Sequence, residues 1–230
     1  PEYAFADTRD EMLKAIRENI HYGATMIKIV VDDQKYIYSV EDIRFMVEEA
    51  HRAGLELSAH CWTRAGAHNA AEAGVDSIEH GQMLTNDDLQ LAKKNHVVLV
   101  GTDFTESAAR EAGFPQLHAV FVDRLKRAFQ MGVTMAFGTD VIVYVPGETR
   151  GTLAAEYVNS WADAGVPAKD TLQAMTINAA RLLGVDRERG AIKPGFAADI
   201  IAVPENPLDN IQAVRKVSFE MKDGSVFKRE

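Results

Sequence analysis

The stretch "AEAGVDSIEHG", Ala71–Gly81, joins the end of a helix to a short apolar strand that finishes with two polar side chains. Gly74 separates the two parts, and glycine commonly ends helices because it adopts a left-handed backbone at no steric cost. The run "VDSIEH" has the length and the β-branched content of a strand. A helix, a glycine and a strand in this order predict one unit of a parallel α/β sheet.

The same unit repeats on both sides of this stretch. Helices are predicted to begin at the capping patterns Ser39–Asp42 and Thr85–Asp88, and the first of them is predicted to end at Gly54. Strands are predicted at Thr25–Val31, Leu55–Ala59, Val75–Glu79, Val97–Thr102 and Val133–Gly138. This alternation favours a (β/α)8 barrel of the TIM type that is only partial, because a complete barrel has eight strands and about 250 residues.

The sequence pattern changes after Gly184. The segment "GAIKPGFAADIIAVPENP" contains short strands and prolines, and Asp223–Gly224 is a hairpin signal. We therefore predict a partial barrel over residues 1–184. Residues 185–230 are predicted to form a small C-terminal β-strand segment of a composite second domain.

The composition excludes several classes of partner. The 230 residues are 47% hydrophobic and 26% charged, as in an ordinary globular chain with a core. A net charge of -9 argues against nucleic acid and against an anionic membrane surface, and no apolar stretch approaches the roughly 20 residues that span a bilayer. The single cysteine, Cys61, excludes an internal disulfide and fits a reducing compartment such as the cytoplasm, although it leaves the localisation open. A small-molecule substrate is the expected partner.

Polar side chains occur at the ends of the predicted strands, where α/β folds bind their ligands. They are Lys28, His60, His80 and Asp140, with Asp103 as a weaker member. Two imidazoles and a carboxylate from separate strands are the ligands of a zinc-like divalent ion. Each residue alone also fits a structural role, since a histidine can hydrogen-bond a turn and an aspartate can cap a loop.

Lys28 stands in the apolar strand "MIKIV", Met26–Val30. A central strand of a parallel sheet is buried on both faces, where a free ammonium group would be costly. Either this strand lies at the edge of the sheet, or the lysine is neutralised. A buried lysine can react with carbon dioxide to form a carbamate, an anion that can bridge two metal ions.

Five segments together resemble the amidohydrolase superfamily, in particular its imidazolonepropionase-like and prolidase-like metal-dependent hydrolases. The segments are "MIKIV", "SAHCW", "VDSIEHG", "FGTD" and "INAARLLG" with "RGAIKPGFAADIIAV" after it. The resemblance runs from about Gly23 to the C-terminus. It implies that the chain contains strands four to eight of the barrel.

The resemblance also implies roles for these residues. Lys28 corresponds to the carboxylated lysine that bridges two metal ions, and His60 and His80 correspond to ligands of the second ion. Asp140 corresponds to the aspartate that binds metal and shuttles protons, and Glu79 would orient the surroundings of His80. The implied cofactor is a divalent metal, zinc, with one or two ions in the complete enzyme.

One family feature is missing from the sequence. Members carry a His-x-His pair on strand one, and this chain has no such pair. Because the chain opens on a predicted helix, we expect strands one to three to precede it in a longer parent protein. A barrel opened beside Thr25–Val31 exposes an unpaired strand edge. We therefore expect a homo-oligomer, or a complementing N-terminal half, as partner.

Three residues are candidates for substrate contact. Trp62 follows His60 and is expected to form a wall of the pocket, and Arg64 begins the next helix. Arg150 ends a polar loop, "YVPGETRG", that could cover the site. Dipeptide-cleaving relatives have a tyrosine at the position of Trp62, so the resemblance does not name a dipeptide as the substrate.

The favoured function is hydrolysis of an amide, a cyclic amide or another C–N bond by a metal-activated water, with Asp140 as proton shuttle. Two alternatives stay open. The chain could be a non-catalytic fragment of such an enzyme, or a metal-free small-molecule-binding α/β module. The second alternative is disfavoured because the sequence has no glycine-rich phosphate loop.

Overall fold

The structure is a computed structural model that describes residues 4–33 and 35–230. These residues form an α/β fold of two compact units. Unit 1 comprises the described residues up to Val100 together with Met131–Thr134, and unit 2 comprises Gly101–Gln130 and Met135–Glu230. This division concerns compactness alone, and the boundary after Gly184 stays a prediction.

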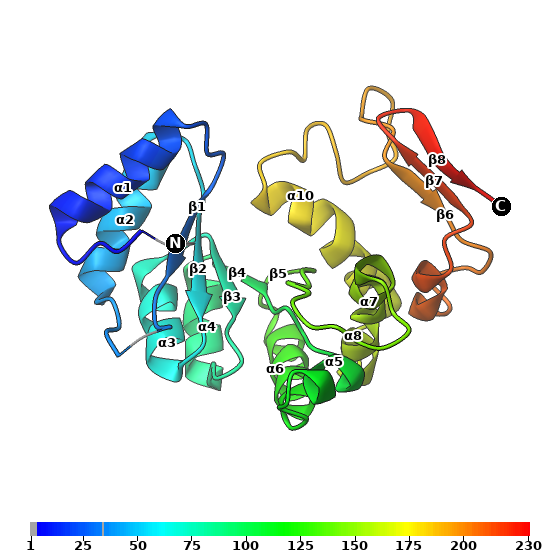
Figure 1. The fold of residues 1–230 in the computed structure, drawn as a ribbon, viewed down its shortest axis with the longest axis horizontal. Coiled ribbons are helices and arrows are strands. Elements are labelled where there is room, and N and C mark those ends of the chain that lie inside the picture. The colour runs from blue at the N-terminus through cyan, green and yellow to red at the C-terminus, as the bar shows by residue number, and fades with distance from the viewer. Residues whose placement is uncertain (1–3, 34) are drawn as a thin grey trace. The chain divides into compact units, whose positions relative to one another are not determined.

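Unit 1 is built on parallel strands that follow one another in the sheet in chain order (Figure 1). They are β1 (Ile27–Val30), β2 (Leu57–Cys61), β3 (Ser77–His80) and β4 (Val98–Val100). The register pairs Lys28 with Ser58, and it pairs His60 with Val30 on one side and with Glu79 on the other. Because successive side chains alternate between the faces of a sheet, these partners share one face.

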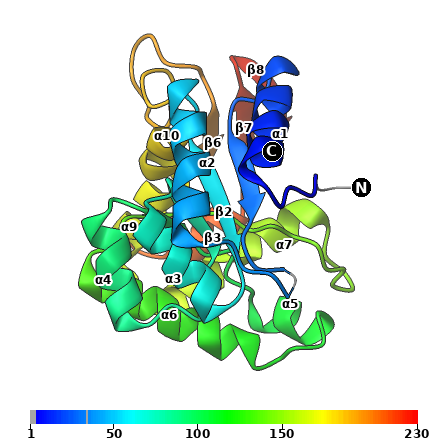
Figure 2. The same cartoon turned by 90° about the vertical axis from the view of Figure 1, so that its left-hand side faces the viewer.

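Helices α2 (Val40–Arg52) and α3 (Arg64–Ala73) lie against one face of this sheet (Figure 2). Helix α1 (Arg9–His21) packs beside α2, and α4 (Asn86–Lys94) packs beside α3. Each of the four helices begins at a Ser or Thr whose hydroxyl accepts a hydrogen bond from a first-turn amide, which confirms the capping patterns at Ser39 and Thr85.

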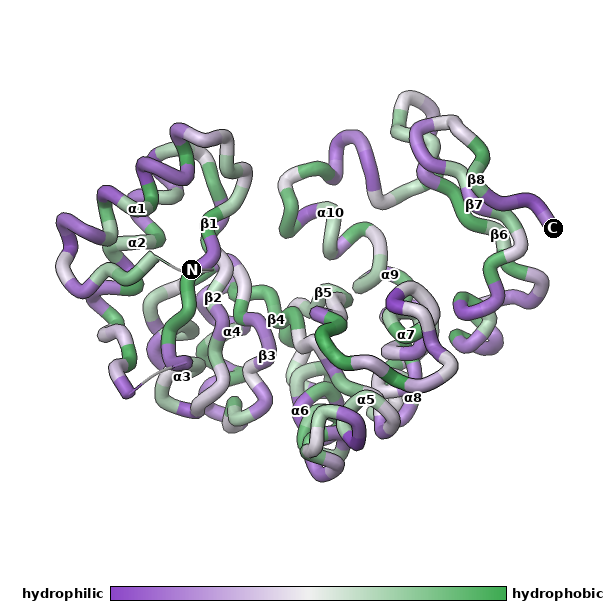
Figure 3. The backbone as a smooth tube through the Cα atoms, in the orientation of Figure 1, coloured by the Kyte–Doolittle hydropathy of each residue, from purple (hydrophilic) through white to green (hydrophobic). Residues whose placement is uncertain are grey.

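The core of unit 1 follows from the hydropathy of these elements. The β4 segment is uniformly hydrophobic, whereas α1 alternates hydrophobic and hydrophilic positions along its length (Figure 3). Ile43 of α2, Leu57 of β2 and Ile78 of β3 are fully buried. The sheet therefore buries aliphatic side chains against the apolar stripes of the helices that cover it.

Unit 2 contains a helical layer and a small sheet. Its first part holds α5 (Glu106–Glu111), α6 (Leu117–Met131), the short strand β5 (Met135–Ala136), α7 (Arg150–Glu156) and α8 (Val158–Asp163). The helical stretch that follows consists of α9 (Ala168–Gln173), a π-helical turn (Ala174–Asn178) and α10 (Ala179–Leu182). Aromatic rings of Phe104, Phe121 and Tyr157 form the centre of its core.

The C-terminal segment is an antiparallel sheet of β6 (Ile200–Ala202), β7 (Phe219–Lys222) and β8 (Ser225–Arg229). A short 3-10 helix, Ile211–Arg215, lies between β6 and β7 in the chain. Asp223 and Gly224 both have positive φ angles, 46° and 79°, which is the geometry of a two-residue hairpin turn. The predicted hairpin is confirmed.

Several elements differ from their sequence-based bounds. The helical stretch from Arg150 to Asp163 is two helices, α7 and α8, that meet at Tyr157. The strand predicted at Val133–Gly138 is only two residues long. In the part of the chain that the structure describes, no helix is long and apolar enough to cross a membrane.

Candidate metal centre

Two of the predicted ligands meet in unit 1. His60 lies near the carboxyl end of β2 and His80 is the last residue of β3, the neighbouring strand. The His60 Nδ1 and His80 Nε2 atoms are 3.0 Å apart, and the ring centroids are 4.5 Å apart. Residues 20 positions apart in the chain thus bring two imidazole nitrogens to one point at the carboxyl edge of the sheet.

The backbone conformation of His80 directs its ring toward His60. In the register, His80 pairs with Cys61, which is fully buried on the face opposite to His60. Regular alternation would therefore direct His80 away from His60. The φ angle of His80 is +67°, a left-handed conformation that is uncommon outside glycine. This conformation costs on the order of 1–3 kcal/mol and occurs preferentially at functional sites.

The nitrogen pair fits a zinc-like ion. Zn–N distances of about 2.0–2.1 Å in a tetrahedral site place two ligand nitrogens about 3.3 Å apart, close to the observed 3.0 Å. A second observation also suits a polar ligand nearby. The Oε1 atom of Gln82, two residues after His80, is buried without a hydrogen-bond partner within the described residues.

Trp62 stands beside both imidazoles. Its ring is stacked on His60 with a centroid distance of 6.4 Å and meets His80 edge-on at 5.4 Å. The Trp62 amide donates to Asp32 Oδ1 at 2.8 Å, and its carbonyl accepts from Gln82 Nε2 at 2.7 Å. The side chain remains 38% exposed, so it forms a wall that is open to solvent.

Asp32 lies beside the candidate site, because it accepts the hydrogen bond from the Trp62 amide, and it was not among the predicted site residues. It follows β1 and is buried, and its Oδ2 atom accepts hydrogen bonds from the amide and the hydroxyl of Thr63. A side chain at Gly66 would place its Cβ within 2.1 Å of Asp32 Oδ2, which explains the glycine in the first turn of α3. A carboxylate directly after an apolar strand was the available signal, since ligand-binding edges collect such residues.

Glu79 shares the His60 face of the sheet. Its Oε1 atom accepts hydrogen bonds of 2.9 Å from the hydroxyls of Ser58 and Ser77. The carboxylate therefore joins β2 and β3 on the sheet face that carries His60. Its role as an orienting group for His80 stays a prediction.

Lys28 does not occupy a buried central strand. β1 is the first strand of the sheet, and Lys28 is exposed whereas Ile27 and Ile29 are buried. Of the two alternatives, the edge strand is the one observed, so burial does not force this lysine to be neutralised. Lys28 shares a sheet face with His60 through the register, and its carboxylation stays a prediction.

Asp140 belongs to unit 2, four residues after β5. It is exposed, and its φ angle is +42°. Thr102, two residues after β4, also has a positive φ of 50°. Non-glycine residues with a positive φ angle therefore occur at the end of β3 and shortly after β4 and β5. The membership of Asp140 in the ligand set stays a prediction.

Comparisons with known proteins identify the family of the chain. The model of the amidohydrolase family matches residues 2–227. The chain belongs to the amidohydrolase family. Ochratoxinase from Aspergillus niger is 31% identical over 97% of this chain and 50% of its own length. Imidazolonepropionase from Symbiobacterium thermophilum is 31% identical over 72% of this chain and 37% of its own length.

Solved structures are similar as well. A Xaa-Pro dipeptidase with bound methionine superposes with a TM-score of 0.85 at 28% identity, covering 97% of this chain and 59% of that chain. The structure of A. niger ochratoxinase gives 0.81 at 27% identity, covering 98% and 56%. This amidohydrolase chain therefore spans about half the length of the curated relatives it matches.

Asp103 is not accessible as a metal ligand. It is fully buried in unit 2 and forms an ion pair with Arg124, which is also fully buried. Burial raises the pKa of Asp103, and the Arg124 charge opposes that shift only in part. Gly101 makes room for the pair, because a Cβ there would lie 2.3 Å from Arg124 Nη1. The expectation of a weaker ligand at Asp103 is corrected to a core ion pair.

The two arginines predicted to contact substrate are both exposed. Arg64 opens α3, and its Nε atom lies 3.8 Å from Asp88 Oδ2 in α4. Arg150 opens α7 after the loop that follows Asp140. Their contacts with a substrate stay predictions.

Proposed function

We propose that this chain is the C-terminal part of a metal-dependent amidohydrolase that cleaves amide or other C–N bonds. The observation that carries the proposal is the pair of imidazole nitrogens, 3.0 Å apart, at the carboxyl ends of β2 and β3. We further propose that the parallel sheet is strands four to eight of a (β/α)8 barrel. Support comes from two similar structures, and this chain covers 59% of the length of each.

The proposed ligands of the metal are His60, His80 and Asp140, with Lys28 in its carboxylated form as a bridge if two ions bind. Zinc is the proposed ion because it accepts imidazole nitrogen together with carboxylate oxygen. A divalent ion held there would lower the pKa of a coordinated water to near 7 and polarise the substrate carbonyl.

The remaining chemistry falls to the chain's own side chains. Asp140 accepts a proton from the attacking water and delivers it to the leaving nitrogen. Trp62, whose backbone is held by Asp32 and Gln82, limits the pocket beside the histidines. Arg64 and Arg150 are proposed to contact the polar end of the substrate.

The names of the relatives suggest substrates to test first. They are Xaa-Pro dipeptides, an ochratoxin and imidazolonepropionate, the substrates that the names of the similar proteins indicate. Their reactive groups are amides or related C–N bonds, so one panel covers the proposed class.

The decisive variant is Asp140→Asn in the complete parent protein. The amide keeps the shape of the carboxylate but cannot take the proton, and general acid–base catalysis is typically worth about 10²–10⁴-fold. We expect kcat to fall by about 10²-fold or more while the protein remains folded. Steady-state kinetics on the panel, with zinc content measured in parallel, provide the test.

Asp209→Asn is the matched control, because Asp209 is an exposed aspartate of the same unit with no proposed role. It should leave kcat unchanged. A rate for Asp140→Asn within about tenfold of the unmodified enzyme would remove Asp140 as the proton carrier.

A further inference from the structure

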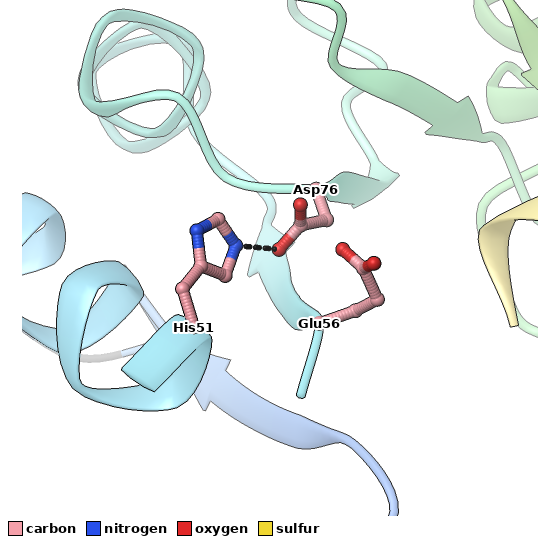
Figure 4. Close-up of side chains that lie close together, drawn as sticks. All are labelled: His51, Glu56 and Asp76. Atoms are coloured by element: carbon pink, nitrogen blue, oxygen red, sulfur yellow. Dashed lines mark hydrogen bonds and ion pairs between the residues drawn. The ribbon is translucent and has the colours of Figure 1, made fainter. Parts of the chain in front are cut away.

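A second group of metal-ligating side chains lies at the opposite end of the unit 1 strands. It consists of His51, Glu56 and Asp76, which come from the end of α2 and from the residues just before β2 and β3 (Figure 4). Glu56 and His60 are four positions apart along an extended segment, or roughly 13 Å at about 3.3 Å per residue. The group is therefore separate from the His60–His80 pair.

The three side chains converge. One ligand atom of each residue lies within 4.8 Å of a ligand atom of the other two. His51 Nε2 is 2.8 Å from Asp76 Oδ2, and the Glu56 carboxyl group turns toward the same Asp76 carboxylate (Figure 4). Nitrogen and carboxylate oxygen at such separations are suitable ligands for one zinc-like ion.

The backbone holds the group in place before any ion binds. The Asp76 amide donates to the Leu57 carbonyl at 3.0 Å, and the Leu57 amide donates to Asp76 Oδ2 at 2.7 Å. The Glu56 carbonyl accepts from the Ile27 amide at 3.0 Å. Two of the three residues thus stand on hydrogen-bonded strand ends, which limits the entropy lost when a ligand is bound.

The charge of the group also suits a divalent cation. Two carboxylates close together repel each other when both are ionised. With both carboxylates ionised and the imidazole neutral, the three side chains carry two negative charges. A divalent cation would neutralise them.

We propose that His51, Glu56 and Asp76 form a second divalent-cation site, which binds zinc independently of the proposed catalytic centre and ties α2 to β2 and β3. Three protein ligands leave at least one coordination position for water. Because Glu56 and Asp76 lie at the amino ends of β2 and β3, the site serves the stability of unit 1 rather than turnover.

Zinc alone is the probe. The chelator-treated chain is titrated with Zn²⁺ in a calorimeter, and crystals soaked in Zn²⁺ are measured at the zinc absorption edge. We expect an anomalous peak between His51, Glu56 and Asp76. Glu56→Gln and Asp76→Asn should each weaken this binding event by about tenfold or more. The asparagine still accepts the Leu57 hydrogen bond, so Asp76→Asn is expected to stay folded.

His68→Gln is the matched control. His68 also contacts two carboxylates, but its Nδ1 atom faces Asp88 and its Nε2 atom faces Glu72, so these carboxylates lie on different sides of the ring. This variant should bind zinc as the unmodified chain does. His80→Asn should remove only the event at the other centre, so the two proposals can fail separately.

An unchanged zinc titration in folded Glu56→Gln and Asp76→Asn chains would overturn the proposal. So would zinc-soaked crystals without an anomalous peak beside Asp76. The three residues would then be an ordinary hydrogen-bonded ion-pair network.

Discussion

At the scale of single residues, two histidines have left-handed backbone conformations, but only one of them belongs to the candidate metal centre. His80 has a φ of 67° and His96, before β4, has a φ of 61°. Among the hydrogen bonds of the described residues, that of the His80 ring joins it to a second imidazole, that of His60, and no such bond is found for His96. The same backbone conformation therefore serves a candidate metal centre at one strand end and a chain reversal at the beginning of another strand.

This pair of histidines allows a matched test of the ligand assignment. Asparagine tolerates the left-handed conformation, so His80→Asn removes the imidazole at little cost to the backbone. We expect its zinc affinity at the His60 centre to fall by about tenfold or more. His96→Asn should retain that affinity. Equal zinc binding by both variants, measured by calorimetry, would remove His80 from the ligand set.

At the scale of elements, the helices of unit 1 depend on their first turns. Thr85 and Asp88 of α4 bond reciprocally, with Asp88 Oδ2 accepting from the Thr85 amide at 2.9 Å. The opposite carboxylate oxygen of Asp88 lies 2.7 Å from His68 of α3. Asp88 thus caps one helix and joins it to its neighbour.

The pH dependence of this cap has a definite sign. Burial alone would raise the pKa of Asp88, but hydrogen bonds from Thr85 and His68 outweigh it and lower the pKa below its ordinary value of 3.8. A lowered pKa stabilises the folded state at pH values above 3.8, and that contribution is lost as the pH falls below it.

We therefore expect Asp88→Asn to lower the free energy of unfolding by about 1 kcal/mol at pH 7. The difference from the unmodified chain should shrink as the pH falls below 3.8. Urea denaturation at several pH values measures it. The exposed neighbour supplies the control, and Asp87→Asn should have a much smaller effect. A pH-independent difference for Asp88→Asn would contradict this account.

At the scale of the whole molecule, the chain is about half as long as its curated relatives. β1 pairs with β2 along one edge, and the sheet of unit 1 begins at this strand. An apolar strand at a sheet edge favours association with another chain. We expect light scattering after gel filtration to find a dimer or larger species whose share grows with protein concentration. A monomer at every concentration would contradict the expectation.

The shorter length relative to these proteins also bears on activity. This chain has no His-x-His pair, which the resemblance assigns to strand one of the family. We expect the isolated 230-residue chain to hydrolyse the substrate panel weakly or not at all. Co-expression with an N-terminal barrel half that carries the His-x-His pair should restore turnover. Full activity of the chain alone would mean that one ion held by His60, His80 and Asp140 suffices.

The sequence by itself determined the local elements and the family. Helix starts at Ser39 and Thr85, the hairpin at Asp223–Gly224 and the alternation of helix and strand follow from short-range chemistry, such as a hydroxyl near an amide or a glycine at a positive φ. These signals act within a few residues, so they can be read without knowing the fold.

Only the tertiary structure decided which side chains meet. Strand alternation would separate His80 from His60, and one left-handed residue reverses that outcome. Lys28 is exposed because β1 begins the sheet. Asp103 is buried and is paired with Arg124, which lies 21 positions away on a helix. Such contacts depend on sheet order and on single backbone angles, which hydrophobic periodicity does not encode.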